Sequence, residues 1–177
     1  MIDFSHNYFA LFGLSPRFRF DPAVLDQAYR ALQSDIHPDR FAGGTEAQQR
    51  MALQSSTRVN EAYRALKDPV QRAQYLLQLN GIEALSETDT QLPMDFLERQ
   101  LERREAAGEA HAAGDARTLS ALRDGVRTEA RDLEDALAHE LDDERAFASA
   151  RSRVRELTFL HKLAGDLDEM LGRLDDR

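Results

Sequence analysis

The chain has 177 residues, which suits one modest domain or two small ones. It contains no cysteine, and this excludes disulfides, thiolate metal sites and a cysteine nucleophile. The acidic excess lies in the second half: residues 1–80 hold nine basic and eight acidic side chains, whereas residues 81–177 hold 14 and 24. A strongly acidic half argues against a nucleic acid or an anionic membrane surface as the partner.

No stretch of the sequence predicts a membrane segment or a targeting signal. The first residues, MIDFSHNYFALFGL, lack a basic start followed by a long apolar run. No apolar run approaches the roughly 20 residues that cross a bilayer. We therefore expect a cytoplasmic protein. Glycine and proline are sparse while alanine, leucine, arginine and glutamate are abundant, which is typical of a helical protein.

Two helices are predicted before residue 40. A short apolar turn covers residues 7–12 and stops at Gly13. Asp21 and Pro22 are typical of a helix cap and of a first helical position, and apolar residues then follow at helical spacing. Pro38 ends this second helix, because the residue before a proline is driven out of the α region.

Two further helices are predicted within the first 80 residues. Thr45 with Gln48 resembles a capping box, which marks the start of a long helix. Asp68 and Pro69 end that helix and open a shorter one, which closes at Gly81. Residues 1–80 are therefore the first predicted domain.

The rest of the chain predicts a linker and a helical bundle. Residues 81–94 are rich in turn formers and lack periodicity, so we expect a linker there. Helical periodicity then returns in three stretches, at residues 95–112, 116–139 and 142 to near the end. Each stretch has an apolar face, and short breaks separate them. Residues 95–177 are therefore expected to fold as an antiparallel three-helix bundle.

A polar tripeptide, His37-Pro38-Asp39, lies between the second and third predicted helices. One interpretation is an acid–base pair of His37 and Asp39. The other is a polar turn whose backbone is fixed by the proline. No nucleophile, phosphate-binding loop or spaced set of metal ligands accompanies the tripeptide. We therefore expect no catalytic residue, no metal and no cofactor.

The motifs around the tripeptide occur in the order found in a J domain. A helix carrying Tyr29 and Leu32 precedes it, and a long helix carrying Asn60-Glu-Ala-Tyr63 follows. Residues 1–80 thus resemble a J domain, which implies a helical hairpin with additional short helices. The resemblance also implies binding to a heat-shock chaperone ATPase of the seventy-kilodalton class and stimulation of its ATP hydrolysis.

Further motifs extend over nearly the whole chain. They are Tyr8-Phe-Ala-Leu-Phe-Gly-Leu14, His37-Pro-Asp-Arg-Phe41, Arg72-Ala-Gln-Tyr-Leu-Leu77, the stretch Phe96–Glu105, and Phe159-Leu160-x-Lys162-Leu163. With them the chain resembles the HscB family, the J proteins of iron–sulfur cluster assembly. The resemblance implies an all-α fold, a J domain followed by a three-helix bundle. It also implies two protein partners, a chaperone ATPase of the HscA type and a cluster scaffold protein of the IscU type.

The chaperone-binding site follows from the family pattern by position. The resemblance implies that it comprises the tripeptide and two basic neighbours: Arg30, His37, Pro38, Asp39 and Arg40. Such a turn presents polar groups at an interface, and the basic residues steer a negatively charged partner. The sequence departs from the pattern at Ser34, where many relatives have a basic residue.

The resemblance places the scaffold-binding site on the bundle, at Leu97, Glu98, Leu101, Glu102, Glu105, Glu109 and Phe159. The four glutamates are spaced four, three and four apart and share one helix face. Periodicity leaves two interpretations open: a solvated acidic face with both leucines in the core, or a docking surface for a basic, partly apolar protein. The resemblance favours the docking surface, although Glu98 and Arg103 depart from the family's usual Met and Leu.

These expectations combine into a two-site adaptor without an enzyme activity of its own. The bundle binds the scaffold protein, and the J domain delivers it to the chaperone, whose ATP turnover promotes cluster transfer to acceptor proteins. The alternative is a general J-domain protein for other clients, which would need a broad exposed apolar surface.

Overall fold

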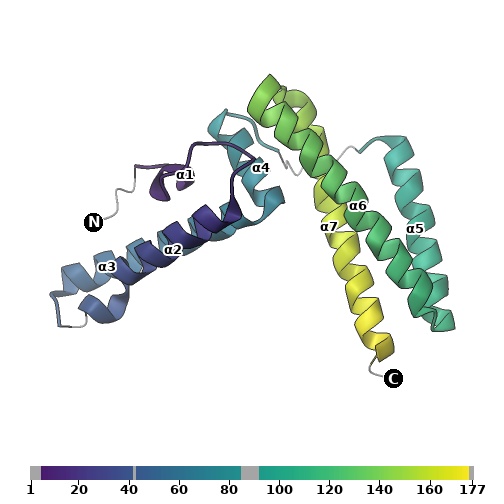
Figure 1. Ribbon diagram of the computed structural model, residues 1–177, viewed down its shortest axis with the longest axis horizontal. Helices are drawn as coiled ribbons and strands as arrows, with labels where there is room; N and C mark the ends of the chain where they lie inside the picture. Colours follow the sequence, from purple (N-terminus) through teal and green to yellow (C-terminus); the bar gives the residue numbers. More distant parts are fainter. Residues whose placement is uncertain (1–4, 42, 85–91, 176–177) are drawn as a thin grey trace. The chain divides into compact units, whose positions relative to one another are not determined.

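The computed structural model describes residues 5–41, 43–84 and 92–175, with backbone alone at Pro38, Asp39 and Asp175. All regular structure in these residues is helical, which confirms the predicted all-α class. The chain divides into two compact units, Met1–Leu79 and Asn80–Arg177 (Figure 1).

The first unit is built on a long helical hairpin. Its elements are α1 (Tyr8–Leu11), α2 (Pro22–Ile36), a 3₁₀ turn η1 (Pro38–Phe41), α3 (Glu46–Lys67) and α4 (Pro69–Leu79). Helices α2 and α3 are antiparallel, since Asp26 bonds to Lys67 near one end and Gln33 to Asn60 nearer the other. Between these pairs the rings of Tyr29 and Tyr63 stack with centroids 4.0 Å apart.

Local capping explains where these helices begin. The Asp21 carboxylate accepts a hydrogen bond from the backbone N–H of Ala23 at 2.9 Å, and Pro22 occupies the first turn. Thr45 and Gln48 form the predicted capping box, in which each side chain bonds to the other's backbone. The predicted starts of α2 and α3 are therefore confirmed.

The second unit is a three-helix bundle formed by α5 (Met94–Ala113), α6 (Ala116–His139) and α7 (Phe147–Asp175). Gly114 turns the chain from α5 into α6 with a φ of 70°, a left-handed conformation that glycine adopts without strain. The core between α6 and α7 is apolar and fully buried, and includes Leu119, Val126, Leu137, Val154, Leu157, Leu160 and Leu167.

The corner between α6 and α7 differs from the prediction. Helix α7 begins at Phe147 instead of near residue 142, because α6 continues into a π-helical turn, η2 (Glu140–Glu144). The chain then reverses at Arg145, which has a φ of 54°. Glu140 is buried at this corner, where its carboxylate accepts hydrogen bonds from the Ser149 hydroxyl and from Arg153 Nε.

The chain segment that precedes α5 is anchored to the bundle. Ala84 is buried, and its carbonyl accepts a hydrogen bond from Arg155 Nε on α7 at 3.2 Å. Most of the expected linker beyond it, residues 85–91, lies outside the described residues.

Candidate partner-binding sites

The His-Pro-Asp tripeptide lies where α2 ends. His37 follows the last helical residue, its side chain is exposed, and its carbonyl accepts a hydrogen bond from the backbone N–H of Arg40 at 3.0 Å. The backbone of Pro38 and Asp39 continues into the 3₁₀ turn η1, whereas their side chains lie outside the described residues. The tripeptide therefore forms a tight turn that presents His37 to solvent.

Arg40 holds this turn against the end of α2. Its Nη1 donates to the backbone carbonyl of Ser34 at 2.9 Å and lies 3.6 Å from the Asp35 carboxylate. Carbonyls in the last turn of a helix have no partner within the helix and favour a nearby cation. Both side chains of the ion pair are mostly exposed, so the contact orients the turn more than it stabilises the fold.

Asp26, in the first turns of α2, is engaged within the hairpin. Asp26 accepts hydrogen bonds from Lys67 Nζ at 2.8 Å and from the Tyr63 hydroxyl at 2.9 Å. The hydrogen bond from Lys67 holds the pKa of Asp26 below its ordinary value, and the same bond raises the pKa of Lys67. Arg30 is exposed on the same helix, one turn after Asp26.

A pocket that the sequence did not predict lies behind the tripeptide. It has a volume of about 420 Å³ and is enclosed by the end of α2, by η1 and by the first turns of α3. Its lining is mostly apolar and includes Ile36, Phe41, Met51 and Ala52. Met51 is 38% exposed although it continues the apolar stripe of α3.

Helix α5 carries the leucines of the predicted scaffold site, and both point to solvent. Leu97 is 39% exposed and Leu101 is 60% exposed. The buried face of α5 consists instead of Phe96, Gln100, Ala107 and Ala110. The structure therefore rejects the interpretation that places the two leucines in the core.

The four glutamates of the predicted site form a continuous acidic stripe beside these leucines. Glu98, Glu102, Glu105 and Glu109 are all exposed on α5. At about 100° per residue they lie on one side of the helix, next to the exposed leucines and away from the buried face. Six of the seven predicted residues thus share one exposed surface.

Phe159, the seventh residue, joins this surface from α7. It is half-buried and meets the Phe96 ring edge-on, with centroids 5.7 Å apart. The Arg104 guanidinium lies 5.2 Å from the centre of the Phe159 ring. Because helical spacing places Arg104 on the same flank of α5 as Leu97 and Leu101, Phe159 lies beside the leucine side of the helix.

Two residues of this surface, Met94 and Arg104, were not predicted from the sequence. Met94 is 70% exposed and lies three residues before Leu97, on the same side of α5. Arg104 is exposed and lies three residues after Leu101. The same spacing that grouped the two leucines could have found both. We name the group Met94, Leu97, Leu101, Arg104 and Phe159, with the four glutamates, the α5 surface.

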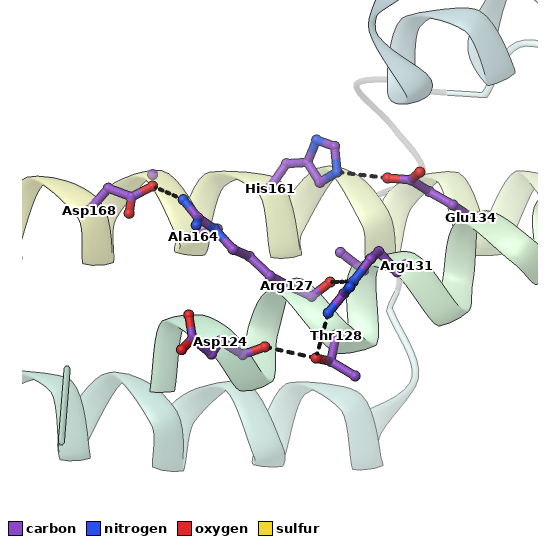
Figure 2. Close-up of a pocket in the computed structure, with 10 residues that line it drawn as sticks. Asp124, Arg127, Thr128, Arg131, Glu134, His161, Ala164 and Asp168 are labelled. Carbon is purple, nitrogen blue, oxygen red and sulfur yellow. Dashed lines mark hydrogen bonds and ion pairs between the residues drawn. The ribbon is translucent and has the colours of Figure 1, made fainter. Parts of the chain in front are cut away.

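The other side of the bundle carries a shallow polar groove of about 910 Å³ between α6 and α7. Figure 2 shows polar side chains meeting across the two helices: Arg127 donates a hydrogen bond to Asp168 at 2.7 Å, and His161 Nε2 lies 3.4 Å from Glu134. His161 lies two residues from Phe159, on roughly the opposite side of α7, so the groove faces away from α5. These contacts cross-link α6 to α7, and we assign the groove no partner.

Across residues 5–41, 43–84 and 92–175, no group of three or more histidine and carboxylate side chains could hold a metal ion. In the same residues, no helix combines the length and the apolarity needed to cross a membrane.

Comparison with known proteins agrees with the geometry of both units. The family model described as DnaJ domain matches residues 7–75, which contain the hairpin and its His-Pro-Asp turn. The fold and the turn together define a J-domain protein. The family model described as HSCB C-terminal oligomerisation domain matches residues 92–168, which cover most of the bundle.

The full-length relatives identify the family. The Co-chaperone protein HscB homolog of Aromatoleum aromaticum is 43% identical over 98% of this chain and 98% of its own length. The solved structure of Chaperone HscB from Vibrio cholerae has a TM-score of 0.86 and 35% identity, covering 96% of this chain and 99% of that one. Human co-chaperone protein HscB has a TM-score of 0.88 and 26% identity, with coverage of 94% and 83%. The chain belongs to the HscB family.

Proposed function

We propose that this protein is a cytoplasmic co-chaperone of iron–sulfur cluster assembly that works as an adaptor between two proteins. Its bundle binds a scaffold protein of the IscU type, and its J domain delivers that scaffold to a chaperone ATPase of the HscA type. Stimulated ATP hydrolysis by the chaperone then promotes cluster transfer to acceptor proteins. The observation that carries the proposal is the exposure of Leu97 and Leu101 beside an acidic stripe.

The α5 surface has the composition of a docking site for a basic, partly apolar protein. Apolar side chains that are exposed in the free protein gain free energy when a partner covers them, about 25 cal/mol per Å² of buried apolar area. Met94 and Leu101, at 70% and 60% exposure, have the most area to bury. The four glutamates do not pack against the core, so they are available to steer and orient a cationic partner.

On the J domain, the proposed chaperone contacts are Arg30, His37, Pro38, Asp39 and Arg40. Exposure of His37 at the end of α2 supports its contact role. Arg40 is proposed to act partly by holding the His-Pro-Asp turn in place, because its guanidinium bonds to the Ser34 carbonyl and lies beside Asp35. Arg30 adds positive charge on α2, where Asp26 is neutralised by Lys67.

The adaptor brings the scaffold close to the chaperone and does not itself catalyse a reaction. ATP is bound and hydrolysed by the chaperone, and this chain contributes no catalytic side chain and no cofactor. When one molecule holds both partners, the second encounter becomes intramolecular and its effective concentration rises, typically to about the millimolar range for short connections. Two moderate interfaces can therefore give efficient delivery.

Calorimetric titration with a purified IscU-type scaffold tests the bundle site. We expect Leu97→Ala/Leu101→Ala to weaken binding by at least about tenfold, since exposed apolar anchors dominate such interfaces. The matched control is Leu53→Ala on α3, because Leu53 is 61% exposed and so nearly equals Leu101. A double variant that binds the scaffold as tightly as wild type would contradict the proposal that the bundle binds the scaffold through these leucines.

A further inference from the structure

Helix α5 packs on the bundle through a face that is poor in large apolar side chains. The residues that face α6 and α7 follow steps of four and three: Phe96, Gln100, Arg103, Ala107 and Ala110. Only Phe96 is large and apolar, two are alanines, and the two in the middle are polar. By contrast, α6 and α7 bury leucine and valine side chains against each other.

The middle of α5 is attached to α6 by a charged contact. Arg103 Nη1 lies 2.5 Å from Glu129 Oε2 on α6, and the same atom donates to Gln100 Oε1 at 3.1 Å. The side chains of Arg103 and Glu129 are only 26% and 25% exposed. Arg99 Nη2 approaches the other carboxylate oxygen at 3.8 Å. We name Gln100, Arg103 and Glu129 the α5 latch.

The latch is not arranged for maximal stability. Gln100 is 1% exposed, and its amide nitrogen has no hydrogen-bond partner among the described residues. A buried polar atom without a partner is costly, and a partly buried ion pair recovers little of its desolvation cost. An apolar set of residues at these positions would hold the helix at least as strongly. Directional polar contacts do, however, define the rotation of a helix more narrowly than apolar contacts.

The latch and the α5 surface lie on the same two helical turns. Arg103 points toward α6, whereas its neighbour Arg104 points toward α7 and covers Phe159. Leu101 lies between the latch residues Gln100 and Arg103 in the sequence and is directed to solvent. A rotation or separation of α5 at the latch would therefore move Leu97 and Leu101 relative to Phe159.

We propose that the α5 latch positions α5, and that it thereby sets the affinity of the α5 surface for its protein partner. Arg103 and Glu129 are positioning residues in this account, and they act through the leucines without touching the partner themselves. This inference rests on the proposed function, because the partner in question is the scaffold protein.

Two measurements on the full chain test the proposal: amide hydrogen exchange in α5, and binding of an IscU-type scaffold. Glu129→Gln keeps the shape of the side chain and removes its charge, so we expect α5 exchange to rise and scaffold affinity to fall, each by about tenfold. Exchange in the α6–α7 core should stay within about twofold of wild type. The matched control is Glu169→Gln, which breaks the exposed Arg173–Glu169 pair on α7 and should change neither quantity.

A rescue variant separates positioning from direct contact. Arg103→Met/Glu129→Leu replaces the ion pair by apolar packing, and we expect it to restore exchange and affinity to within about threefold of wild type. If the double variant restores slow exchange but not affinity, Glu129 or Arg103 contacts the partner and the proposal is wrong. Unchanged α5 exchange in Glu129→Gln also overturns it. A wild-type chain that fails to bind the scaffold contradicts the proposed function instead, while the exchange data still decide whether the latch positions α5.

Discussion

The guanidinium of Arg104 and the ring of Phe159 form a cation–π contact, at 5.2 Å, that links α5 to α7 at the edge of the α5 surface. The Phe96 ring meets the same aromatic ring edge-on. Phe159 is therefore held in place from α5 while part of it stays accessible. A preordered aromatic side chain loses little conformational freedom when a partner binds, and this favours its use as an anchor.

Replacing Phe159 should affect binding more than folding. Phe159→Ala removes the ring from both Arg104 and the partner, so we expect scaffold affinity to fall by about tenfold. The free energy of unfolding should fall by about 1–2 kcal/mol, less than for a fully buried ring. Calorimetric titration measures the scaffold affinity, and urea unfolding measures the free energy of unfolding. Phe159→Leu keeps much of the apolar volume, so it should lose less affinity and less stability than Phe159→Ala. A normal scaffold affinity in Phe159→Ala would show that the ring only packs the bundle.

The Asp26–Lys67 pair predicts an acid-sensitive J domain. The pKa of Asp26 lies below its ordinary value of 3.8, because the folded protein stabilises the carboxylate through Lys67 and Tyr63. Its contribution to stability is thus present above the unfolded pKa and is lost as the pH falls through the folded one. The pKa of Lys67 is raised above 10.5, so its contribution is present below that value and is lost as the pH rises further.

Asp26→Asn tests this prediction. The variant should be less stable than wild type near neutral pH, and the difference should shrink as the pH falls below about 4. Thermal unfolding of the full chain, followed by tyrosine-sensitive near-ultraviolet circular dichroism, reports the hairpin because Tyr29 and Tyr63 stack beside the pair. A stability difference that is independent of pH would mean that packing, and not the charge of Asp26, is responsible.

Glu156 on α7 predicts the opposite pH dependence. Burial raises the pKa of its carboxyl above the ordinary 4.5, a shift that Arg153 and Arg99 partly oppose. The folded state therefore prefers the protonated acid, and stability is greatest below the unfolded pKa and declines as the pH rises through the folded one.

Glu156→Gln should accordingly stabilise the protein at neutral pH, by no more than about 3 °C in Tm, and should lose this advantage in acid. Differential scanning calorimetry at several pH values gives the comparison. The exposed Glu169, whose replacement by Gln removes the same charge from the same helix, is the matched control. Destabilisation by Glu156→Gln at neutral pH would show that the carboxylate gains more from its arginine neighbours than it loses by burial.

Helix boundaries were predictable wherever a local signal fixes the backbone. The capping box of Thr45 and Gln48 and the Asp21-Pro22 start need only residues within one turn. The start of α7 was predicted too early, because the π-helical turn after His139 is stabilised by contacts from a later segment. Ser149 and Arg153 donate hydrogen bonds to Glu140, and no local sequence pattern predicts these contacts.

The grouping of the candidate residues on one face of α5 was predictable from the sequence, but the direction in which that face points was not. Helical spacing grouped the glutamates and leucines of α5, yet it could not decide whether Leu97 and Leu101 face the core. In the structure the buried face of α5 is formed by Phe96, Gln100, Ala107 and Ala110, and Arg103 on the same side pairs with Glu129 of another helix. Since a polar residue occupies the middle of the buried face, apolar periodicity alone was ambiguous.

The most direct test of the adaptor is the steady-state ATPase rate of the cognate HscA-type chaperone. It would be measured with this protein, with and without the IscU-type scaffold, beside His37→Gln and a Leu97→Ala/Leu101→Ala/Phe159→Ala variant. We predict synergistic stimulation by protein and scaffold together, abolished in His37→Gln and reduced in the triple variant mainly in its scaffold-dependent part. Stimulation that is indifferent to the scaffold would contradict the adaptor and leave only a J domain acting on its chaperone.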